Sequence, residues 1–354
     1  MPKRIGHLYE KFSDRNYVKL VLTEACRNRP GRKDVEAVKS DLDNKVEELC
    51  HMLETGSFKP SNVSKFQKYD PGSQKMRTIR TVPFFPDCCI QWLIADALKA
   101  PVLMRGMDAY CSASVPGRGG MHVYKKIKHH ISHKRKDSKY AIQCDVKKYY
   151  DNIPIDGLMD KLERRCKDKR LLGLIRLILE SSAIDKENNI GLCIGFYLNQ
   201  WLANFYLEDA DRAIRNTGRI RCYARYMDNM TVISGNKRRL RKVLSAIVSA
   251  LTVLGLSLKG DYQIYPTKHR DVRAVGYRFF PNGSVMYTKR GWLRARRQFL
   301  RIKHKLRNRL FIPKNMARGM LTRRGSLKHL SSPRTIYKDY ISGIDFAELR
   351  RRAA

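Results

Sequence analysis

Two aspartates of this sequence, Asp145 and Asp228, each lie at the end or turn of a short apolar stretch. Asp145 closes a stretch that begins at Tyr140, and Asp228 precedes Asn229 between two runs of apolar and β-branched residues. Carboxylate oxygens are the ligands that Mg²⁺ prefers, and proteins usually hold this ion through one or two carboxylates together with substrate phosphates. The pair therefore favours a divalent-metal site for phosphoryl transfer.

The segment 222–234, which carries Asp228 and Asn229, predicts a β-hairpin with a carboxylate at its tip. Asp and Asn tolerate the left-handed backbone of tight turns, so such a turn needs no catalytic explanation by itself. The second carboxylate, Asp145 at the end of a predicted buried strand, is what favours chemistry at this turn.

The elements around these two segments predict how the carboxylates come together. We expect helices near 158–168, 170–180 and 196–215, a helix from the capping residue Asn236 to about 254, and a strand that begins at 256–258. This order is typical of a split β-α-β arrangement, a small antiparallel sheet with helices packed on one face. In that topology the end of the first strand lies beside the hairpin tip, so Asp145 and Asp228 can meet.

The first 139 residues predict further elements with functional potential. We expect one amphipathic helix over 33–54, closed by Gly56, then extended structure over 63–83 around a turn at 71–72, and a helix over 90–100. Lys75 and Arg77 share one face of the extended segment, which is either a charged edge strand or a phosphate-binding one. The small-residue loop 112–120 contains Arg118, and its glycines would let the backbone approach a phosphate or sugar, although many surface loops look similar.

The composition indicates a globular protein with a polyanionic partner. The 354 residues are 43% hydrophobic, and 72 Lys and Arg against 33 Asp and Glu give a net charge of +39. This excess of cations is most simply explained by nucleic acid binding. A membrane-surface protein is the alternative, but no basic helix with a broad aromatic face supports it, and no stretch approaches the roughly 20 apolar residues of a membrane span.

We expect a cytoplasmic protein, because the sequence shows no signal-peptide core and no pattern of paired cysteines. The first residues contain no apolar core of the kind a signal peptide needs. The nine cysteines form no Cys-x-x-Cys pair, which predicts reduced thiols in a cytoplasmic protein. His129, His130 and His133 lie among many cations, which favours a solvated basic face over a zinc site.

The last part of the chain predicts a nucleic-acid-binding appendage. No acidic residue occurs from Val272 to Lys338, and many cations follow Trp292 along one probable helix. Cations placed along phosphates release counterions, so their binding tolerates any sequence and depends on salt. The four that we select as nucleic-acid ligands are Arg294, Arg297, Arg301 and Lys305.

These segments also resemble a known family. Tyr226-Met-Asp-Asn229 resembles the Tyr-x-Asp-Asp box of reverse transcriptases, and Asp145 followed by Tyr149-Tyr150 resembles the motif that supplies their other metal-binding aspartate. Asn229 stands where the family usually has its second aspartate. The order of motifs, over roughly residues 8–310, resembles the bacterial reverse transcriptases related to retrons, group II introns and diversity-generating retroelements.

The resemblance implies roles for further residues. Lys75 and Arg77 would grip the incoming triphosphate, Tyr150 would exclude a 2′-hydroxyl, and the Val275-Gly276 turn would hold the primer. The loop 112–119 is similar to a Ser-x-x-x-Arg-Pro-Gly-Arg-Gly element, and 191–200 is similar to a Gly-x-Pro-x-Gly-x-x-x-Ser-Gln element that ends on Gln200. The Ile-Gly pair at 194–195 is closer to the diversity-generating type than to group II introns, and Lys259 matches the basic residue of the next motif. Without the resemblance, Tyr150 is equally well an ordinary buried tyrosine.

The chemistry that the resemblance implies is RNA-templated DNA synthesis with two Mg²⁺ ions, for which Mn²⁺ is a possible substitute. Asp145 and Asp228 would hold both ions, and the carbonyl of Val146 could add a ligand. Asn229 lacks the negative charge that an aspartate would have at this position, which predicts weaker Mg²⁺ binding. Three interpretations stay open: a tolerated natural variant, an Asp→Asn substitution made to trap an inactive complex, and a degenerate copy that only binds RNA.

The predicted fold is α+β, a right-hand polymerase with fingers, palm and a basic helical thumb. We expect an N-terminal extension and fingers over 1–139, the palm over 140–280 with a fingers-type insertion near 155–195, and the thumb and tail over 281–354, without an obvious further catalytic domain.

The expected partners are a structured RNA template from its own element, a DNA or RNA primer, deoxynucleotides, and an accessory protein or a second copy, but no membrane. A retroelement and a phage-defence setting, in a bacterium or phage, both stay open. The rival hypotheses are a non-catalytic RNA-binding protein on a polymerase fold and a generic basic RNA-binding protein.

Overall fold

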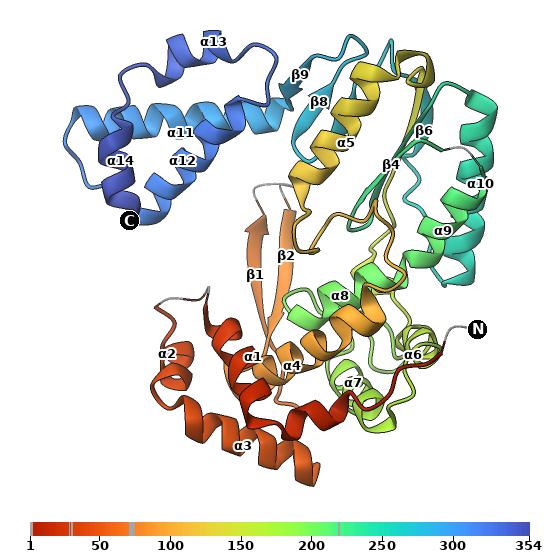
Figure 1. Ribbon diagram of the computed structural model, residues 1–354. Helices are drawn as coiled ribbons and strands as arrows, with labels where there is room; N and C mark the ends of the chain where they lie inside the picture. Colours follow the sequence, from red (N-terminus) through yellow and green to blue (C-terminus); the bar gives the residue numbers. More distant parts are fainter. Residues whose placement is uncertain (1–2, 28, 30, 71–74, 219) are drawn as a thin grey trace.

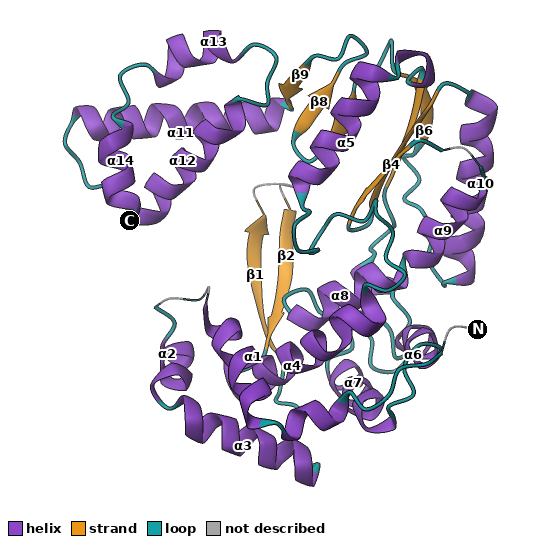
Figure 2. Cartoon of the chain, viewed as in Figure 1, coloured by secondary structure: helices purple, strands orange, loops and turns teal. Residues whose placement is uncertain are grey.

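The computed structural model describes residues 3–27, 29, 31–70, 75–218 and 220–354. Helices make up most of the chain, and the strands form a protruding hairpin and a group beside the helix α5 (Gly120–His133; Figure 2). The N-terminal part contains the helices η1 (Tyr9–Ser13), α1 (Arg15–Arg27), α2 (Lys33–Ser40) and α3 (Leu42–Thr55), followed by the strands β1 (Ser64–Asp70) and β2 (Lys75–Thr81).

The single helix predicted over 33–54 is wrong, because the chain forms two helices that separate at Asp41. The backbone of Asp41 has φ −129° and ψ 39°, outside the helical region. Ser and Asp side chains compete for backbone hydrogen bonds, which makes Ser40-Asp41 a weak point in a helix. The predicted end at Gly56 is confirmed, since this residue has φ 69° and closes α3.

β1 and β2 form an antiparallel hairpin that stands out from the helical body (Figure 1). Lys68 lies opposite Arg77, and Asp70 lies opposite Lys75. The predicted turn at 71–72 lies outside the described residues. Most side chains of this hairpin are exposed, so its stability depends on the attachment of its base to the rest of the molecule.

The central part of the chain carries one four-stranded sheet with the order β4-β5-β3-β6 and antiparallel neighbours. Its strands are β3 (Tyr140–Cys144), β4 (Cys222–Tyr226), β5 (Asn229–Ser234) and β6 (Gln263–Pro266). The helices of this part are η2 (Phe84–Cys88), α4 (Cys89–Leu98), η3 (Lys99–Leu103), α5 (Gly120–His133), η4 (Arg135–Asp137), η5 (Tyr150–Asn152), α6 (Ile155–Glu163), α7 (Lys169–Ser181), α8 (Tyr197–Tyr206), α9 (Glu208–Asn216) and α10 (Lys237–Val253). The hairpin 222–234 and the helix capped by Asn236 are confirmed, and the strand predicted to end on Asp145 ends one residue earlier, at Cys144.

Three predictions in this part are wrong in detail. The helix expected near 158–168 begins at Ile155 and ends at Glu163. The helix expected over 196–215 ends at Tyr206 and a second one starts at Glu208, because the buried Leu207 between them has a non-helical ψ of 1°. Residues 256–258 do not begin a strand, since only Leu258 forms an isolated bridge, to Val146, and β6 starts at Gln263.

The sheet has helices on both faces and not on one, which corrects the predicted layering. On one face Ile142, Val232 and Tyr223 belong to the same core as the apolar side of α10. On the other face α5 lies against β4, where the side chains of the sheet are small (Figure 1). This second core includes Ala141, Cys222, Ala224 and Ile233 of the sheet and Val123, Tyr124, Ile127 and Ile131 of α5. The histidine cluster of α5 is accordingly divided: His129 and His133 stack at 4.4 Å on the surface, but His130 is buried and contacts the carbonyl of Asp137.

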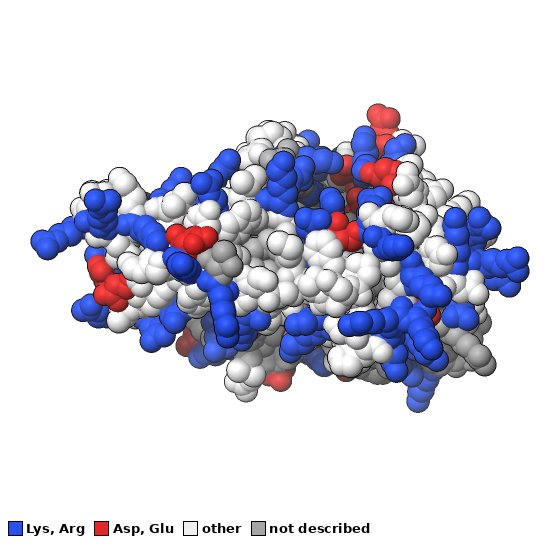
Figure 3. Space-filling view, turned by 90° about the horizontal axis from the view of Figure 1, so that it is seen from above, with Lys and Arg blue, Asp and Glu red and all other residues white. Residues whose placement is uncertain are grey.

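The C-terminal part joins a small sheet to a helical region. β7 (Val272–Ala274), β8 (Tyr277–Phe279) and β9 (Val285–Tyr287) form an antiparallel three-stranded sheet that shares the second core with α5. The helices α11 (Lys289–Arg307), α12 (Lys314–Leu327), α13 (Pro333–Ile336), η6 (Tyr337–Ile341) and α14 (Phe346–Ala353) follow. Lys and Arg side chains are spread widely over the face shown in Figure 3, with few acidic ones between them. Among the described residues, no helix is both long enough and apolar enough to cross a membrane.

Candidate active site at the tip of the central hairpin

The register of the central sheet brings the two predicted aspartates together. Cys144, the last residue of β3, lies opposite Met230 of β5, so Asp145 follows the strand beside the turn that carries Asp228. Burial, followed by the neighbouring carboxyl group of Asp145 at hydrogen-bonding reach, raises the pKa of Asp228 to about 7. Oδ1 of Asp145 is shielded from solvent and has no hydrogen-bond partner among the described residues. Two half-buried carboxyl groups in contact fit a bound divalent cation, because its charge would remove the repulsion between them.

The β4–β5 turn adopts a different backbone from the one that its Asx pair predicts. The left-handed residue is Met227, with φ 56°, whereas Asn229 already pairs with Tyr226 as the first residue of β5. Nδ2 of Asn229 donates to Oδ1 of Asp228 at 3.4 Å. The amide group of Asn229 therefore presents a donor to Asp228, where an aspartate would add a second negative charge.

The backbone beside Asp145 is fixed by the segment after α10. The N–H of Lys259 donates to the carbonyl of Asp145 at 2.8 Å, and the N–H of Lys147 donates to the carbonyl of Ser257 at 2.9 Å. Val146, between them, is buried. The ammonium of Lys259 forms an ion pair with Asp261, which raises the pKa of Lys259, and the charge of Asp145 adds to this effect.

Tyr150 and Arg77 both interact electrostatically with Asp228. Burial, and secondarily the carboxylate of Asp228, raise the pKa of the Tyr150 phenol. Arg77 reaches Asp228 from β2, where its positive charge opposes the rise of the Asp228 pKa. Arg77 also donates to Asp70 at 3.2 Å, and Lys75 is exposed at the start of β2. The fingers hairpin and the aspartate pair are thus close enough to interact electrostatically.

Gln200 and the loop 112–119 lie in contact. Oγ of Ser114 donates to Oε1 of Gln200 on α8 at 3.2 Å. Nη1 of Arg118 donates at 2.8 Å to the carbonyls of both Asp108 and Cys111, so this guanidinium closes the loop from within. The predicted contact of Arg118 with nucleic acid stays a prediction.

A cleft of about 630 Å³ opens beside the aspartate pair. Asp145, Asn229 and Lys259 line it together with the cations Arg270 and Arg273. The cleft is also lined by Gly120, Val123, Ala274 and Val275. The β7–β8 turn therefore lies at the cleft. Gly276 has φ 88° and completes that turn, as a position where glycine avoids strain.

The predicted thumb cations face the tip of the fingers hairpin. Arg294, Arg297 and Arg301 of α11 line a second cleft, of about 580 Å³, with Tyr69 of β1 and Met316 of α12. Lys305 is directed elsewhere, since its Nζ donates to the carbonyl of Phe311 at 2.7 Å in the α11–α12 connection. Three of the four selected cations therefore line one surface.

Arg225 is the residue near the site that the sequence analysis missed. It is fully buried in β4, and its Nη1 donates to the carbonyl of Met227 in the turn at 2.9 Å. The signal was present, because a cation in the middle of an apolar strand requires a buried partner. Among the described residues no three His, Cys, Asp or Glu side chains gather as a metal site. A metal ion at Asp145 and Asp228 would thus depend on backbone, water or substrate oxygens for its other ligands.

Comparison with known proteins agrees with this geometry. Residues 66–264, more than half of the chain, match the family described as Reverse transcriptase (RNA-dependent DNA polymerase). The fold is therefore α+β with the fingers and palm of a polymerase. The chain belongs to the reverse transcriptase family.

Two curated relatives carry shorter similarities. The chain is 24% identical over 179 residues to the group II intron-encoded protein LtrA of Lactococcus lactis subsp. cremoris, which covers 49% of this chain and 28% of the relative. It is 31% identical over 82 residues to the COX1/OXI3 intron 2 protein of Saccharomyces cerevisiae, which covers 22% of this chain and 10% of the relative. The matched region thus spans less than a third of either relative.

Proposed function

We propose that this chain is an RNA-directed DNA polymerase that makes cDNA from a structured RNA of its own genetic element. The observation that supports this most is the contact of the Asp145 and Asp228 carboxyl groups at the edge of a basic cleft. These carboxylates, with the carbonyl of Val146, would hold two Mg²⁺ ions, or Mn²⁺ in their place. The ions would supply activation of the primer 3′-hydroxyl and neutralise charge on the leaving pyrophosphate.

The chain's own side chains bind and orient the substrates in this proposal. Lys75 and Arg77 approach the triphosphate from the fingers hairpin, and Lys259 adds a cation at the cleft. The ring of Tyr150 lies where a 2′-hydroxyl would have to fit, which favours deoxynucleotides. Gln200, fixed by Ser114, contacts the template and the nucleotide.

The proposed nucleic-acid path leads from the cleft to the thumb. Gly276 contacts the primer, Arg118 holds the loop that faces the template, and Arg294, Arg297 and Arg301 bind phosphates along α11. Residues 1–139, 140–280 and 281–354 act as fingers, palm and thumb. An accessory protein or a second copy of the chain completes the assembly, and the protein works in the cytoplasm of a bacterium.

Asn229 separates an active enzyme from a disabled one. An aspartate at this position would add charge beside Asp228, whereas the amide of Asn229 donates to Asp228. This contact favours a second candidate function, a polymerase homologue that retains RNA binding and has lost catalysis. The aspartate pair itself is intact, so we propose the active enzyme first and the binding protein second.

The setting that we propose is a retroelement. One relative is named as a group II intron-encoded protein and the other as an intron 2 protein, which supports a mobile-element setting. A diversity-generating retroelement is the form that the Ile194-Gly195 pair favours. A phage-defence reverse transcriptase is the alternative.

Primer extension on an RNA template tests the proposal. The purified chain is compared with Asp228→Asn, Asn229→Asp and the control Asp43→Asn, whose carboxylate pairs with Lys19 far from the site. Mg²⁺ and Mn²⁺ are supplied in separate reactions, and binding of the same template–primer is measured by fluorescence anisotropy. We expect deoxynucleotide incorporation by the given chain and by Asp43→Asn, with loss in Asp228→Asn.

Each other outcome has a definite meaning. Incorporation only after Asn229→Asp shows that the given chain is a disabled enzyme. RNA binding without incorporation by any variant overturns the polymerase proposal and leaves the binding protein.

A further inference from the structure

The guanidinium of Arg225 is one of the most completely bonded groups in the molecule. It is 0% exposed, and all five of its N–H groups have acceptors. Nε and Nη2 donate to the two carboxylate oxygens of Asp211 at 2.7 and 2.6 Å. The other three bonds go to Oδ1 of Asn204 at 3.2 Å, to the carbonyl of Asn204 at 3.2 Å and to the carbonyl of Met227 at 2.9 Å.

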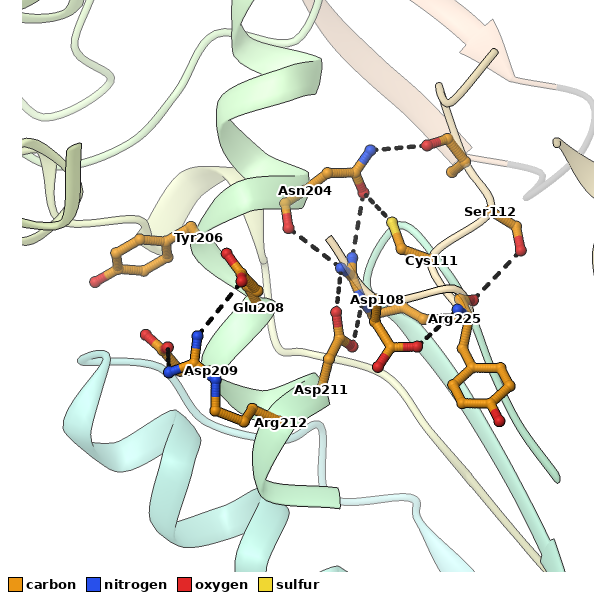
Figure 4. Close-up of polar contacts among 12 residues, drawn as sticks. Asp108, Cys111, Ser112, Asn204, Tyr206, Glu208, Asp209, Asp211, Arg212 and Arg225 are labelled. Carbon is orange, nitrogen blue, oxygen red and sulfur yellow. Dashed lines mark hydrogen bonds and ion pairs between the residues drawn. The ribbon is translucent and has the colours of Figure 1, made fainter. Parts of the chain in front are cut away.

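The acceptors of Arg225 come from three separate elements. Asn204 lies near the end of α8 and Asp211 lies on α9, and both point toward Arg225 (Figure 4). Met227 lies in the β4–β5 turn. Asp211 is 1% exposed and also accepts a hydrogen bond from the hydroxyl of Tyr223. Asn204 is held in turn, since its Nδ2 donates to the carbonyl of Ala113 at 2.8 Å. The guanidinium therefore connects the α8–α9 junction rigidly to the turn.

The bond to Met227 acts on the peptide unit that precedes Asp228. The carbonyl of Met227 and the N–H of Asp228 belong to one planar peptide group. A hydrogen bond that fixes this carbonyl therefore also fixes the direction of the bond from the peptide nitrogen to the Cα atom of Asp228. Met227 is in the left-handed region with φ 56°, which costs a residue with a Cβ about 1 kcal/mol and needs support from its surroundings. The guanidinium supplies that support.

β4 does not need this side chain to keep its place. The backbone N–H of Arg225 donates to the carbonyl of Tyr110 at 2.9 Å, and its carbonyl accepts from the N–H of Ser112 at 3.0 Å. β4 also pairs with β5 along its length. Burying an ion pair is costly, and replacing one with apolar residues is often neutral or stabilising. Stability alone thus gives a weak reason for a buried arginine two residues from the turn.

We propose that Arg225, held by Asp211 and Asn204, is a positioning residue that sets the Met227–Asp228 peptide so that the Asp228 carboxylate faces Asp145 in the geometry that a divalent cation requires. This inference rests on the proposed function. Lysine cannot take over the role, because its ammonium has three donors and lacks the planar fork that spans Asp211 and the Met227 carbonyl together. The substitution Arg225→Lys keeps the charge and removes the fork.

The control is another buried cation at the same helix junction. Nζ of Lys161 donates to the carbonyl of Tyr206 at 3.0 Å and to Asp209 at 2.8 Å, and the residue is 7% exposed. Lys161→Met therefore perturbs the α8–α9 junction without removing a bond to the turn. Asn204→Ala is a milder variant that keeps the Arg225–Asp211 pair and removes one bond on Nη1.

Metal binding is measured without catalysis, as the loss of the free Mn²⁺ signal in electron paramagnetic resonance during titration of the full chain. The Mg²⁺ concentration for half-maximal primer extension and the midpoint of thermal unfolding are measured on the same preparations. We expect Arg225→Lys to weaken Mn²⁺ binding and to raise the Mg²⁺ requirement at least about tenfold, which is about 1.4 kcal/mol, and Asn204→Ala to do so about threefold. Lys161→Met should lower the unfolding midpoint and leave both metal constants within about twofold of the unmodified chain.

The outcomes separate this inference from the function on which it rests. If the unmodified chain neither binds Mn²⁺ nor extends a primer, the proposed function fails. If it does both and Arg225→Lys matches it, or if Lys161→Met weakens metal binding as much as Arg225→Lys does, the positioning role is refuted and the function stands. Should Arg225→Lys not fold, Asn204→Ala decides by the same criteria.

Discussion

The backbone N–H of Arg80 donates to the carbonyl of Ile194 at 3.0 Å and so attaches the last part of β2 to the loop that leads into α8. The hairpin that carries Lys75 and Arg77 thereby has a fixed relation to the helix that carries Gln200. The close approach is possible because the next residue, Gly195, has no side chain: a Cβ there would overlap the carbonyl of Arg80.

Gly195→Ala should therefore weaken nucleotide binding. Gly195 also has φ 123°, which residues with a Cβ rarely adopt, so the substitution strains the loop as well as pushing β2 away. We expect the KM for deoxynucleotides to rise about tenfold with a smaller change in kcat, because the fingers cations move while the aspartate pair does not. Steady-state primer extension at varied nucleotide concentration measures both constants.

Gly173→Ala is the matched control for this experiment. Gly173 lies within α7, and a Cβ on it would meet open space. This change should leave KM unaltered and stabilise the helix by up to about 1 kcal/mol. An unchanged KM in Gly195→Ala would mean that the hairpin attachment does not position the triphosphate ligands.

The local part of the site was predictable from sequence, and the reason is visible in its segments. β3, β4 and β5 are each encoded by a short apolar run, and one polar turn separates β4 from β5. Patterns of this kind involve residues that are close together in the sequence, so they can be recognised without the fold. The proximity of Asp145 and Asp228 followed from the topology that these runs imply. The Asn236 cap was predictable for the same reason, since it depends only on Arg239 three residues later.

What the sequence did not reveal depends on contacts far apart in the chain. The packing of α5 on the second sheet face requires Ala141 of β3 and Cys222 and Ala224 of β4 to lie on one face, on either side of β5, which only the folded sheet achieves. The break at Leu207 carries no local signal, because leucine is a good helix former and nothing in its residue type ends a helix. The bonds of Arg225 join three elements, so no local pattern contains them.

Tyr150 should control the choice between deoxynucleotides and ribonucleotides. Its ring lies edge-on to Tyr149 at 5.6 Å, and the hydroxyl of Tyr149 is anchored to the carbonyl of Ala203, so the Tyr150 ring has a firm support. We expect Tyr150→Ala to raise the ratio of kcat/KM for ribonucleotides to that for deoxynucleotides by about 100-fold. Competing incorporation of the two nucleotide types measures this ratio.

Tyr150→Phe is the matched variant, because it keeps the ring and removes only the hydroxyl. If exclusion is steric, Phe should preserve the selectivity within about threefold. Equal loss of selectivity in the two variants would show that the hydroxyl, and not the ring, makes the discrimination.

The cations of α11 should bind phosphates in a salt-dependent manner. Arg297 and Arg301 line the same cleft as Tyr69, and each phosphate contact releases about one counterion. Replacing either arginine with alanine should lower the slope of log K against log salt by about one, with similar effects on different nucleic-acid sequences. Fluorescence anisotropy of a labelled RNA–DNA duplex over a series of KCl concentrations measures the slope.

Arg238→Ala, on the exposed surface of α10, is the control for the thumb variants. It removes the same charge from the chain but lies on an element that covers the palm sheet and not the cleft. We expect its slope to match that of the unmodified chain. A drop as large as that of Arg297→Ala would mean that net charge, and not the α11 surface, determines binding.

Asp271 should make the small sheet β7–β9 sensitive to acid. Burial opposes its ionisation, but hydrogen bonds from Arg278 and Arg273, each at 3.0 Å, outweigh it and lower the pKa of Asp271 to about 2. Because this pKa is lower in the folded state than the ordinary value of about 4, the ionised carboxylate stabilises the fold above pH 4. That stabilisation is lost as the pH falls from about 4 toward 2.

Asp271→Asn tests this directly by urea unfolding at a series of pH values. We expect the variant to be less stable by about 1 kcal/mol at pH 7, less than the full shift implies because Arg273 is 57% exposed, with the difference falling toward zero near pH 2. Asp156→Asn, whose carboxylate is 64% exposed and pairs with Arg176 at 2.7 Å, should change the free energy of unfolding by less than about 0.5 kcal/mol. A difference between the unmodified chain and Asp271→Asn that does not shrink on acidification would mean that the two arginines do not depress this pKa.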